Sequence, residues 1–185
     1  ASRMGYEGKL VALDASENRL RALERGTRRF PDDTLQIETY PMAFEDWSRE
    51  NEGVLFDKVL VDAPCSATGT ARRRPDVLRK ELDLEALAAT QAALLDAAWR
   101  CLKPGGLLVF SSCSALTADA EQSFAAFLQR TADAHLVEVA AAELGFVDDA
   151  GVVDGALRLW PWHVAGDVGG CDAHFAARAR KGGPG

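Results

Sequence analysis

Short apolar runs alternate along this chain with longer stretches in which apolar side chains recur every three or four residues. Runs that are continuously apolar or strictly alternating are typical of strands, and the longer spacing is typical of amphipathic helices. The runs predict strands over residues 9–13, 35–40, 56–62, 107–112, 135–139, 156–160 and 174–178. The longer stretches predict helices over residues 16–26, 83–102 and 119–130.

Strands alternate with helices from Lys9 to Val139, which indicates a doubly wound α/β fold with a mainly parallel sheet. Residues 103–106, Lys-Pro-Gly-Gly, predict a turn after the longest helix. Residues 145–155 and 164–170 predict loops between the last strands. Ligands of such sheets bind outside the carboxyl ends of the strands, so the residues that follow each strand are the candidates for function.

The composition fits one globular domain, with 48% hydrophobic and 26% charged residues in a chain of 185. No apolar run approaches the ~18 residues that a membrane-spanning helix needs. The first residues carry no apolar segment of a secretory signal, so we expect a cytoplasmic protein with no membrane partner.

The net charge of −7 is unevenly distributed. Residues 131–172 hold eight acidic residues and one basic residue, Arg158, and account for all of it. The clearest basic cluster is residues 72–80, which begins with Arg72, Arg73 and Arg74. Such a cluster is either a solvated loop or a phosphate-binding surface, and charge alone leaves both interpretations open.

The four cysteines are too few and too scattered for a disulfide framework, and no C-x-x-C pair suggests structural zinc. Cys101, at the end of an apolar helix, and Cys171 fit the role of small buried side chains. Cys65 and Cys113 each follow a predicted parallel strand and are flanked by Ser, Pro and Gly, where a thiol is reachable. The three histidines are scattered, and we expect no metal site.

The first predicted strand ends at Asp14. An acid in this place accepts hydrogen bonds from ribose hydroxyls in dinucleotide folds, but it also suits a helix N-terminus for electrostatic reasons. Without further context, the two interpretations stand equal.

Two segments together resemble the RNA 5-methylcytosine methyltransferase family, and in particular its bacterial 16S rRNA branch of the RsmB/Sun (Fmu) type. Residues 62–66, Asp-Ala-Pro-Cys-Ser, followed by Gly69, Arg73 and a Pro-Asp pair, resemble the family's motif IV. Residues 112–114, Ser-Cys-Ser, resemble its motif VI, which is usually Thr-Cys-Ser. The resemblance covers nearly the whole chain and implies a Rossmann-like S-adenosylmethionine-dependent methyltransferase fold with an antiparallel C-terminal strand.

The resemblance also implies roles for individual residues. Cys113 corresponds to the nucleophile that attacks carbon 6 of cytosine, and Cys65 to the cysteine that helps to eliminate the covalent adduct. Asp62 corresponds to the acid that holds the base and also lies at the cofactor, and Pro64 shapes the turn there. Asp14 corresponds to the acid that binds the cofactor ribose. The resemblance favours phosphate contacts for Arg72, Arg73 and Arg74, with 16S rRNA as the expected partner.

The chain departs from the family pattern near its beginning. The glycine-rich loop that surrounds the methionine end of the cofactor has no counterpart before Lys9, and residues 1–5 are similar to the end of the helix that follows that loop. We therefore expect residues 1–185 to be the C-terminal part of a methyltransferase catalytic domain, truncated after motif I and lacking the N-terminal RNA-binding domain. The acid expected near Tyr40 is also absent, and the late Asp-Gly-Phe-Phe motif is Asp-Ala-His-Phe at residues 172–175.

Other functions compete with this one. The departures from motif I favour a catalytically incompetent RNA-binding or assembly module, whereas two intact cysteine motifs favour an enzyme. A tRNA cytosine-5 methyltransferase carries the same motifs. Methyltransferases acting on DNA, protein or a small molecule form a third class, and DNA cytosine-5 enzymes take their nucleophile from the Pro-Cys of motif IV. The second cysteine, Cys113, favours the RNA group.

Overall fold

The computed structural model describes residues 8–27, 35–144, 151–163 and 170–183. The chain divides into two compact units, residues 1–53 and 54–185, which are described separately. Parts of three predictions lie outside the described residues: the helix end at 1–5 and most of the loops at 145–155 and 164–170. No helix in the described ranges is long and apolar enough to cross a membrane.

The first unit is a parallel strand pair with two helices. Strands β1 (Gly8–Leu13) and β2 (Leu35–Tyr40) pair in parallel, as a strand–helix–strand connection through α1 (Glu17–Thr27) requires. Helix α2 (Phe44–Glu50) was not predicted, because its seven residues present a single apolar pair. The ring of Trp47 is buried and lies parallel to that of Phe44, which fixes this short helix.

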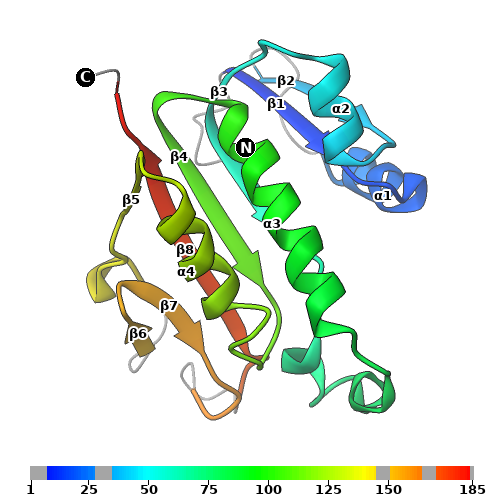
Figure 1. The fold of residues 1–185 in the computed structure, drawn as a ribbon. Helices are drawn as coiled ribbons and strands as arrows, with labels where there is room; N and C mark the ends of the chain where they lie inside the picture. Colours follow the sequence, from blue (N-terminus) through cyan, green and yellow to red (C-terminus); the bar gives the residue numbers. More distant parts are fainter. Residues whose placement is uncertain (1–7, 28–34, 145–150, 164–169, 184–185) are drawn as a thin grey trace. The chain divides into compact units, whose positions relative to one another are not determined.

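The second unit is built on a mixed sheet (Figure 1). Strand β3 (Phe56–Asp62) pairs in parallel with β4 (Leu102–Ser112), as predicted from their apolar runs. Strand β8 (His174–Lys181) runs antiparallel to β4, which confirms the expected antiparallel C-terminal strand. On its other side, β8 pairs antiparallel with β5 (Ala134–Leu136) and with β7 (Ala156–Leu159). The sheet is therefore more mixed than the strand–helix alternation indicated.

Two helices pack on one face of this sheet, α3 (Leu84–Arg100) and α4 (Glu121–Arg130) (Figure 1). Alternate side chains of β4 point towards these two helices. Among them, Phe110 is fully buried against Phe124 of α4, with ring centroids 5.7 Å apart. A fully buried side chain of this kind contributes about 1.5–3 kcal/mol to stability. The short 3-10 helices η2 (Thr68–Thr70), η3 (Pro75–Arg79) and η4 (Ala141–Leu144) lie in the connections.

The predicted turn at residues 103–106 is wrong. Helix α3 ends at Arg100, and β4 already begins at Leu102, opposite Phe56 of β3. The register then shifts, because Lys58 pairs with Leu107. The Pro-Gly-Gly sequence therefore forms a bulge within the strand rather than a turn before it.

The predicted loop over residues 145–155 is also wrong at its end. Strand β6 (Gly151–Val153) pairs antiparallel with β7 through a two-residue connection. Both connecting residues, Asp154 and Gly155, have positive φ, at 50° and 76°. Asp-Gly favours this type of hairpin turn, so a hairpin signal was present in the sequence.

Candidate active site

The segments that follow β3 and β4 meet at the carboxyl edge of the sheet. Asp62 pairs with Ser111 in the register of the two strands, and the backbone N–H of Ala63 donates to the Ser111 carbonyl over 2.9 Å. This pairing brings the sulfur atoms of Cys65 and Cys113 within 3.5 Å of each other. Both side chains are partly exposed. The predicted convergence of the two thiols is present in the structure.

Gly69 ties three segments together around this edge. Its N–H donates to the Cys113 carbonyl and its carbonyl accepts from the Ala173 N–H, each over 3.0 Å. A Cβ atom on Gly69 would lie 2.3 Å from the Ala173 oxygen and 2.5 Å from the Cys113 oxygen. Glycine is therefore required here because two backbone segments approach it closely.

Three buried hydroxyl groups, those of Ser66, Thr68 and Ser114, connect the loop that carries Cys65 with the loop that carries Cys113. The Ser66 hydroxyl lies 3.0 Å from that of Thr68 and 2.9 Å from that of Ser114. The backbone N–H of Ala115 donates to the Thr68 hydroxyl over 2.9 Å. This network connects the residue after Cys65 with the residue after Cys113, so neither loop can shift independently.

Asp119 also connects these loops, and its side chain is fully buried. Its Oδ2 atom accepts from the Ser66 N–H over 2.6 Å, and its carbonyl accepts from the Ser112 hydroxyl over 3.1 Å. The side-chain amide of Gln91, on α3, donates to the carbonyls of both Pro64 and Asp119. A side chain of helix α3 therefore anchors the turn that carries Cys65.

Arg158 on β7 supports the other loop. Its side chain is only 1% exposed; Nη1 donates to the Ser114 carbonyl over 2.7 Å, and Nε lies 3.0 Å from Oε1 of Glu121. Burial lowers the pKa of Arg158, while the carboxylates of Glu121 and Asp119 act in the opposite direction. A buried guanidinium with these partners holds the backbone directly after Cys113.

The hydrogen bond between the two thiols shifts their pKa values in opposite directions. The hydrogen bond from Cys113 lowers the pKa of Cys65 to about 6, although burial opposes this effect. The same hydrogen bond, together with burial, raises the pKa of Cys113. At neutral pH, the negative charge therefore resides on the Cys65 sulfur and Cys113 is the thiol that donates to it.

This arrangement predicts how Cys65 reacts with iodoacetamide. Because only the thiolate is nucleophilic, its alkylation rate should be half-maximal near pH 6 and should fall as the pH drops below that value. Mass spectrometry of peptides after timed alkylation measures the rate at each cysteine. Cys101 is the internal control, since burial raises the pKa of its thiol. In Cys113→Ala the midpoint should move upward; an unchanged midpoint would contradict the shared proton.

Asp62 and His174 lie on the opposite sheet face from α3 and α4. Strand β3 alternates, so the exposed Asp62 points away from the face of the buried Val61. The His174 ring, at the start of β8, contacts the Ser111 hydroxyl through Nε2 over 3.0 Å. Burial lowers the pKa of His174, and the Asp62 carboxylate opposes that shift. An exposed carboxylate and an imidazole with a lowered pKa therefore lie on this face of the sheet.

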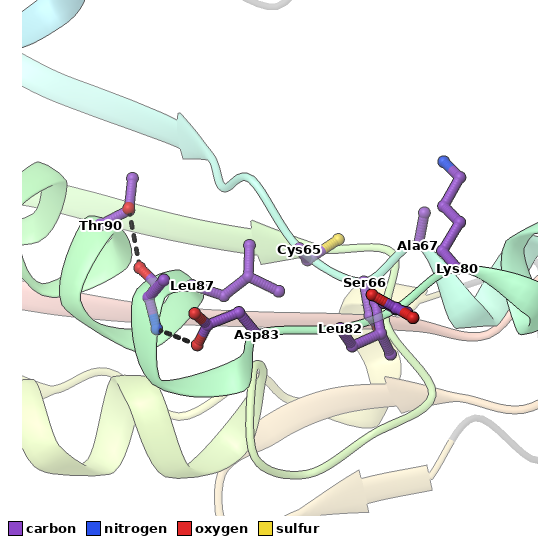
Figure 2. A pocket seen from close by; sticks show the side chains of 10 residues that line it. Cys65, Ser66, Ala67, Lys80, Leu82, Asp83, Leu87 and Thr90 are labelled. Atoms are coloured by element: carbon purple, nitrogen blue, oxygen red, sulfur yellow. Dashed lines mark hydrogen bonds between the residues drawn. The ribbon is translucent and has the colours of Figure 1, made fainter.

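A cavity of about 350 Å³ opens beside Cys65 (Figure 2). Its wall runs from the Cys65 turn to the first two turns of α3, where the Asp83 carboxylate caps the helix by accepting from the Ala86 N–H. Lys80 supplies a cation, and Leu82 and Leu87 supply apolar surface. The cavity is large enough for one nucleotide-sized group next to the reactive sulfur.

The basic cluster lies close to this edge, but its three arginines differ. Arg73 is bound through its guanidinium to both carboxylate oxygens of Asp172. Arg74 lies 3.4 Å from Asp76, and Arg72 is exposed and contributes to lowering the pKa of the Asp172 carboxyl. Arg73 is therefore engaged in an ion pair that joins two loops, and Arg72 and Arg74 retain more freedom to meet a phosphate.

Asp14 lies at the end of β1 in the first unit. Its Oδ1 accepts from the Ser16 N–H over 2.7 Å, and Arg19 contacts both carboxylate oxygens. Burial raises the pKa of Asp14, but these hydrogen bonds outweigh it and the net shift is downward. The carboxylate is 27% exposed and has acceptor sites left for a hydroxyl group.

Sequence reasoning missed several residues that position the thiols. The sequence pattern indicates only a charged residue at Arg158 and only the start of a helix at Asp119. Polar side chains within otherwise apolar stretches, such as Gln91 in α3 and Arg158 in β7, were the available signal. Among the described ranges, no group of three His, Cys, Asp or Glu side chains could hold a metal ion.

Comparisons with known proteins agree with this geometry. The family model described as 16S rRNA methyltransferase RsmB/F matches residues 1–178. The ribosomal RNA small subunit methyltransferase B of Xanthomonas campestris is 44% identical over 146 residues, which are 77% of this chain and 33% of that protein. The chain thus spans about a third of the length of the curated relatives it matches.

Solved structures share the fold. The crystal structure of PH0851 superposes with a TM-score of 0.79 at 27% identity, covering 96% of this chain and 38% of that one. The structure described as NSun6 from Pyrococcus horikoshii with SFG gives a TM-score of 0.75 at 27% identity, covering 98% and 43%.

Proposed function

Since this chain belongs to the 16S rRNA methyltransferase RsmB/F family, we propose that it carries the reaction centre of an enzyme that methylates carbon 5 of a cytosine in 16S rRNA. The observation that supports this most directly is the 3.5 Å separation of the Cys65 and Cys113 sulfur atoms at the carboxyl edge of the sheet. A scaffold or a simple RNA-binding module has no need for two reachable thiols that share a proton.

The chain corresponds to part of the complete enzyme. We propose that residues 1–185 form the C-terminal part of the catalytic domain, acting in the cytoplasm, and that the methyl donor is S-adenosylmethionine. The acceptor sites left on Asp14 fit a ribose hydroxyl of that cofactor. When bound, the cofactor supplies a methyl group on a positively charged sulfur.

The first step is the addition of a thiolate to the base. Cytosine carbon 5 is a poor nucleophile until carbon 6 is attacked, so Cys113 passes its proton to the Cys65 sulfur and adds to carbon 6. A bond forms between sulfur and carbon 6, and the carbon 5–carbon 6 double-bond pair moves through the ring towards nitrogen 3. Asp62 hydrogen-bonds the protonated nitrogen 3 and so stabilises the electron-rich ring. Carbon 5 then takes the methyl group, the cofactor sulfur would keep the electron pair of the broken bond, and the proton that nitrogen 3 took up from water returns to water.

The second step removes the hydrogen of carbon 5. Cys65 releases the acquired proton to water and is again a thiolate. It takes the carbon 5 proton, the carbon 5–carbon 6 double bond re-forms, and the Cys113 sulfur leaves with its electron pair. The target base must leave its stack to reach both thiols, which favours a single-stranded or splayed-out nucleotide.

The proposed function is tested by methylation in vitro. The enzyme carrying this chain is incubated with 16S rRNA and cofactor labelled in the methyl group, and the RNA is digested to nucleosides for mass spectrometry. The label is expected in 5-methylcytidine, and bisulfite mapping locates the cytosine. A variant with both Cys65→Ala and Cys113→Ala should incorporate none. Label in another nucleoside would refute the proposed chemistry, and label in tRNA but not in 16S rRNA would refute the proposed substrate.

A further inference from the structure

Two stacked indoles, of which the outer one is exposed, follow strand β7. The rings of Trp160 and Trp162 are parallel within 5°, with centroids 5.1 Å apart. Trp162 is 68% exposed, so its outer face is open to solvent. His163 fixes the turn, because its Nδ1 accepts from the Trp160 N–H over 3.3 Å and its ring meets Trp162 edge-on. A large aromatic side chain held in one orientation with an open face is ready to stack on another flat ring.

This pair lies at the catalytic edge of the sheet. Strand β7 ends where β8 begins, since Leu159 pairs with His174. The Arg158 guanidinium lies 4.4 Å from the centroid of the Trp160 ring, and the same group donates to the Ser114 carbonyl. One side chain therefore separates the stacked indoles from the loop of the proposed nucleophile.

A short segment connects the turn that carries the indoles to the basic cluster. The Cys171 thiol donates to the Trp160 carbonyl over 3.0 Å, which fixes the 171–172 segment against the Trp turn. The next residue, Asp172, binds Arg73, and the exposed Arg72 acts on its carboxyl. The basic cluster and the stacked indoles are thus attached to one short segment.

We propose that Trp162 is a stacking platform for an unpaired RNA base that flanks the target cytosine, while Arg72 and Arg74 meet the phosphates. Surfaces that bind single-stranded nucleic acid combine aromatic faces for the bases with cations for the backbone, and this edge has both. The proposal extends the proposed function from the reacting base to its neighbour. The exposed cations of the basic cluster, Arg72 and Arg74, favour a polyanion over an apolar protein partner.

The test measures binding of an unstructured oligoribonucleotide that lacks cytosine, at fixed low salt, by quenching of tryptophan fluorescence or by anisotropy. Stacking of one base is worth enough that Trp162→Ala should weaken binding about tenfold. Trp162→Phe keeps an aromatic face and should retain most of the affinity. Val153→Ala, an exposed apolar side chain on β6, is the matched control and should bind like the parent protein.

Equal affinity of Trp162→Ala and the parent protein would overturn the proposal, and so would an equal loss in Val153→Ala. A thermal unfolding curve for each variant verifies that the fold is kept. Because the oligonucleotide contains no target base, this readout is independent of methyl transfer. If methylation fails while Trp162-dependent binding holds, the proposed chemistry is wrong and the platform stands; the reverse result refutes the platform alone.

Discussion

Cys113→Ala is expected to reduce methyl transfer by at least about 10³-fold, as loss of a covalent nucleophile does in other enzymes. Without this sulfur, carbon 6 receives no electron pair and carbon 5 cannot accept the methyl group. Transfer of labelled methyl groups to 16S rRNA, followed over long incubation times, measures the loss. The RNA affinity should change little, since the substitution removes one sulfur atom from a loop held by Gly69 and Arg158.

Cys101→Ala is the matched control for this prediction, because that thiol is buried at the end of α3 and has no contact with the reaction centre we propose. It should leave the rate nearly unchanged. If Cys113→Ala stayed active while Cys65→Ala lost all activity and formed no adduct, the nucleophile would be Cys65. That outcome would match the charge distribution of the free pair, in which Cys65 carries the thiolate.

Cys65→Ala is expected to trap the enzyme on its RNA. In this variant the Cys113 proton passes to water instead of to Cys65, so the Cys113 sulfur still adds to carbon 6 and the methyl group still transfers. The sulfur that lay 3.5 Å from Cys113 is no longer present to remove the carbon 5 proton. The covalent complex should accumulate to nearly one RNA per enzyme molecule. A denaturing gel with labelled RNA measures this, because the slower band survives conditions that separate all non-covalent complexes.

The double variant with Cys65→Ala and Cys113→Ala is the control, and it should show no slower band. Normal turnover by Cys65→Ala would exclude Cys65 as the base for elimination. Loss of turnover without an adduct would show that Cys113 cannot add to carbon 6 unless Cys65 accepts its proton. The two single variants together therefore assign one role to each sulfur.

The central elements of the fold could be predicted because their apolar runs are long and regular. Strand β3 and helices α1, α3 and α4 lie close to their predicted ranges, and β4 ends where predicted. The errors share a cause: short elements depend on contacts that the local pattern does not contain. Helix α2 is fixed by the Trp47 ring, and the Pro-Gly-Gly segment enters β4 because Leu102 finds a partner in Phe56.

The two thiols could be predicted to meet because parallel strands deliver their carboxyl ends to one edge, and the structure shows this for Cys65 and Cys113. The residues that hold them could not. Arg158 is 44 residues from the carbonyl that it supports, and its burial follows from strand pairings late in the chain. The assignment of charge to Cys65 also depends on geometry, because identical thiols titrate differently once one donates to the other.

Strand β8 has a consequence for biosynthesis. It follows in the sequence all the strands that it joins, and it lies between β4 on one side and β5 and β7 on the other. Until β8 pairs with β4, β7 cannot join the rest of the sheet. Arg158 on β7 then cannot support the loop that carries the proposed nucleophile, Cys113. The support that Arg158 gives to the loop after Cys113 can thus form only once residues 174–181 have been translated, so this part of the candidate site is completed late in the synthesis of these residues.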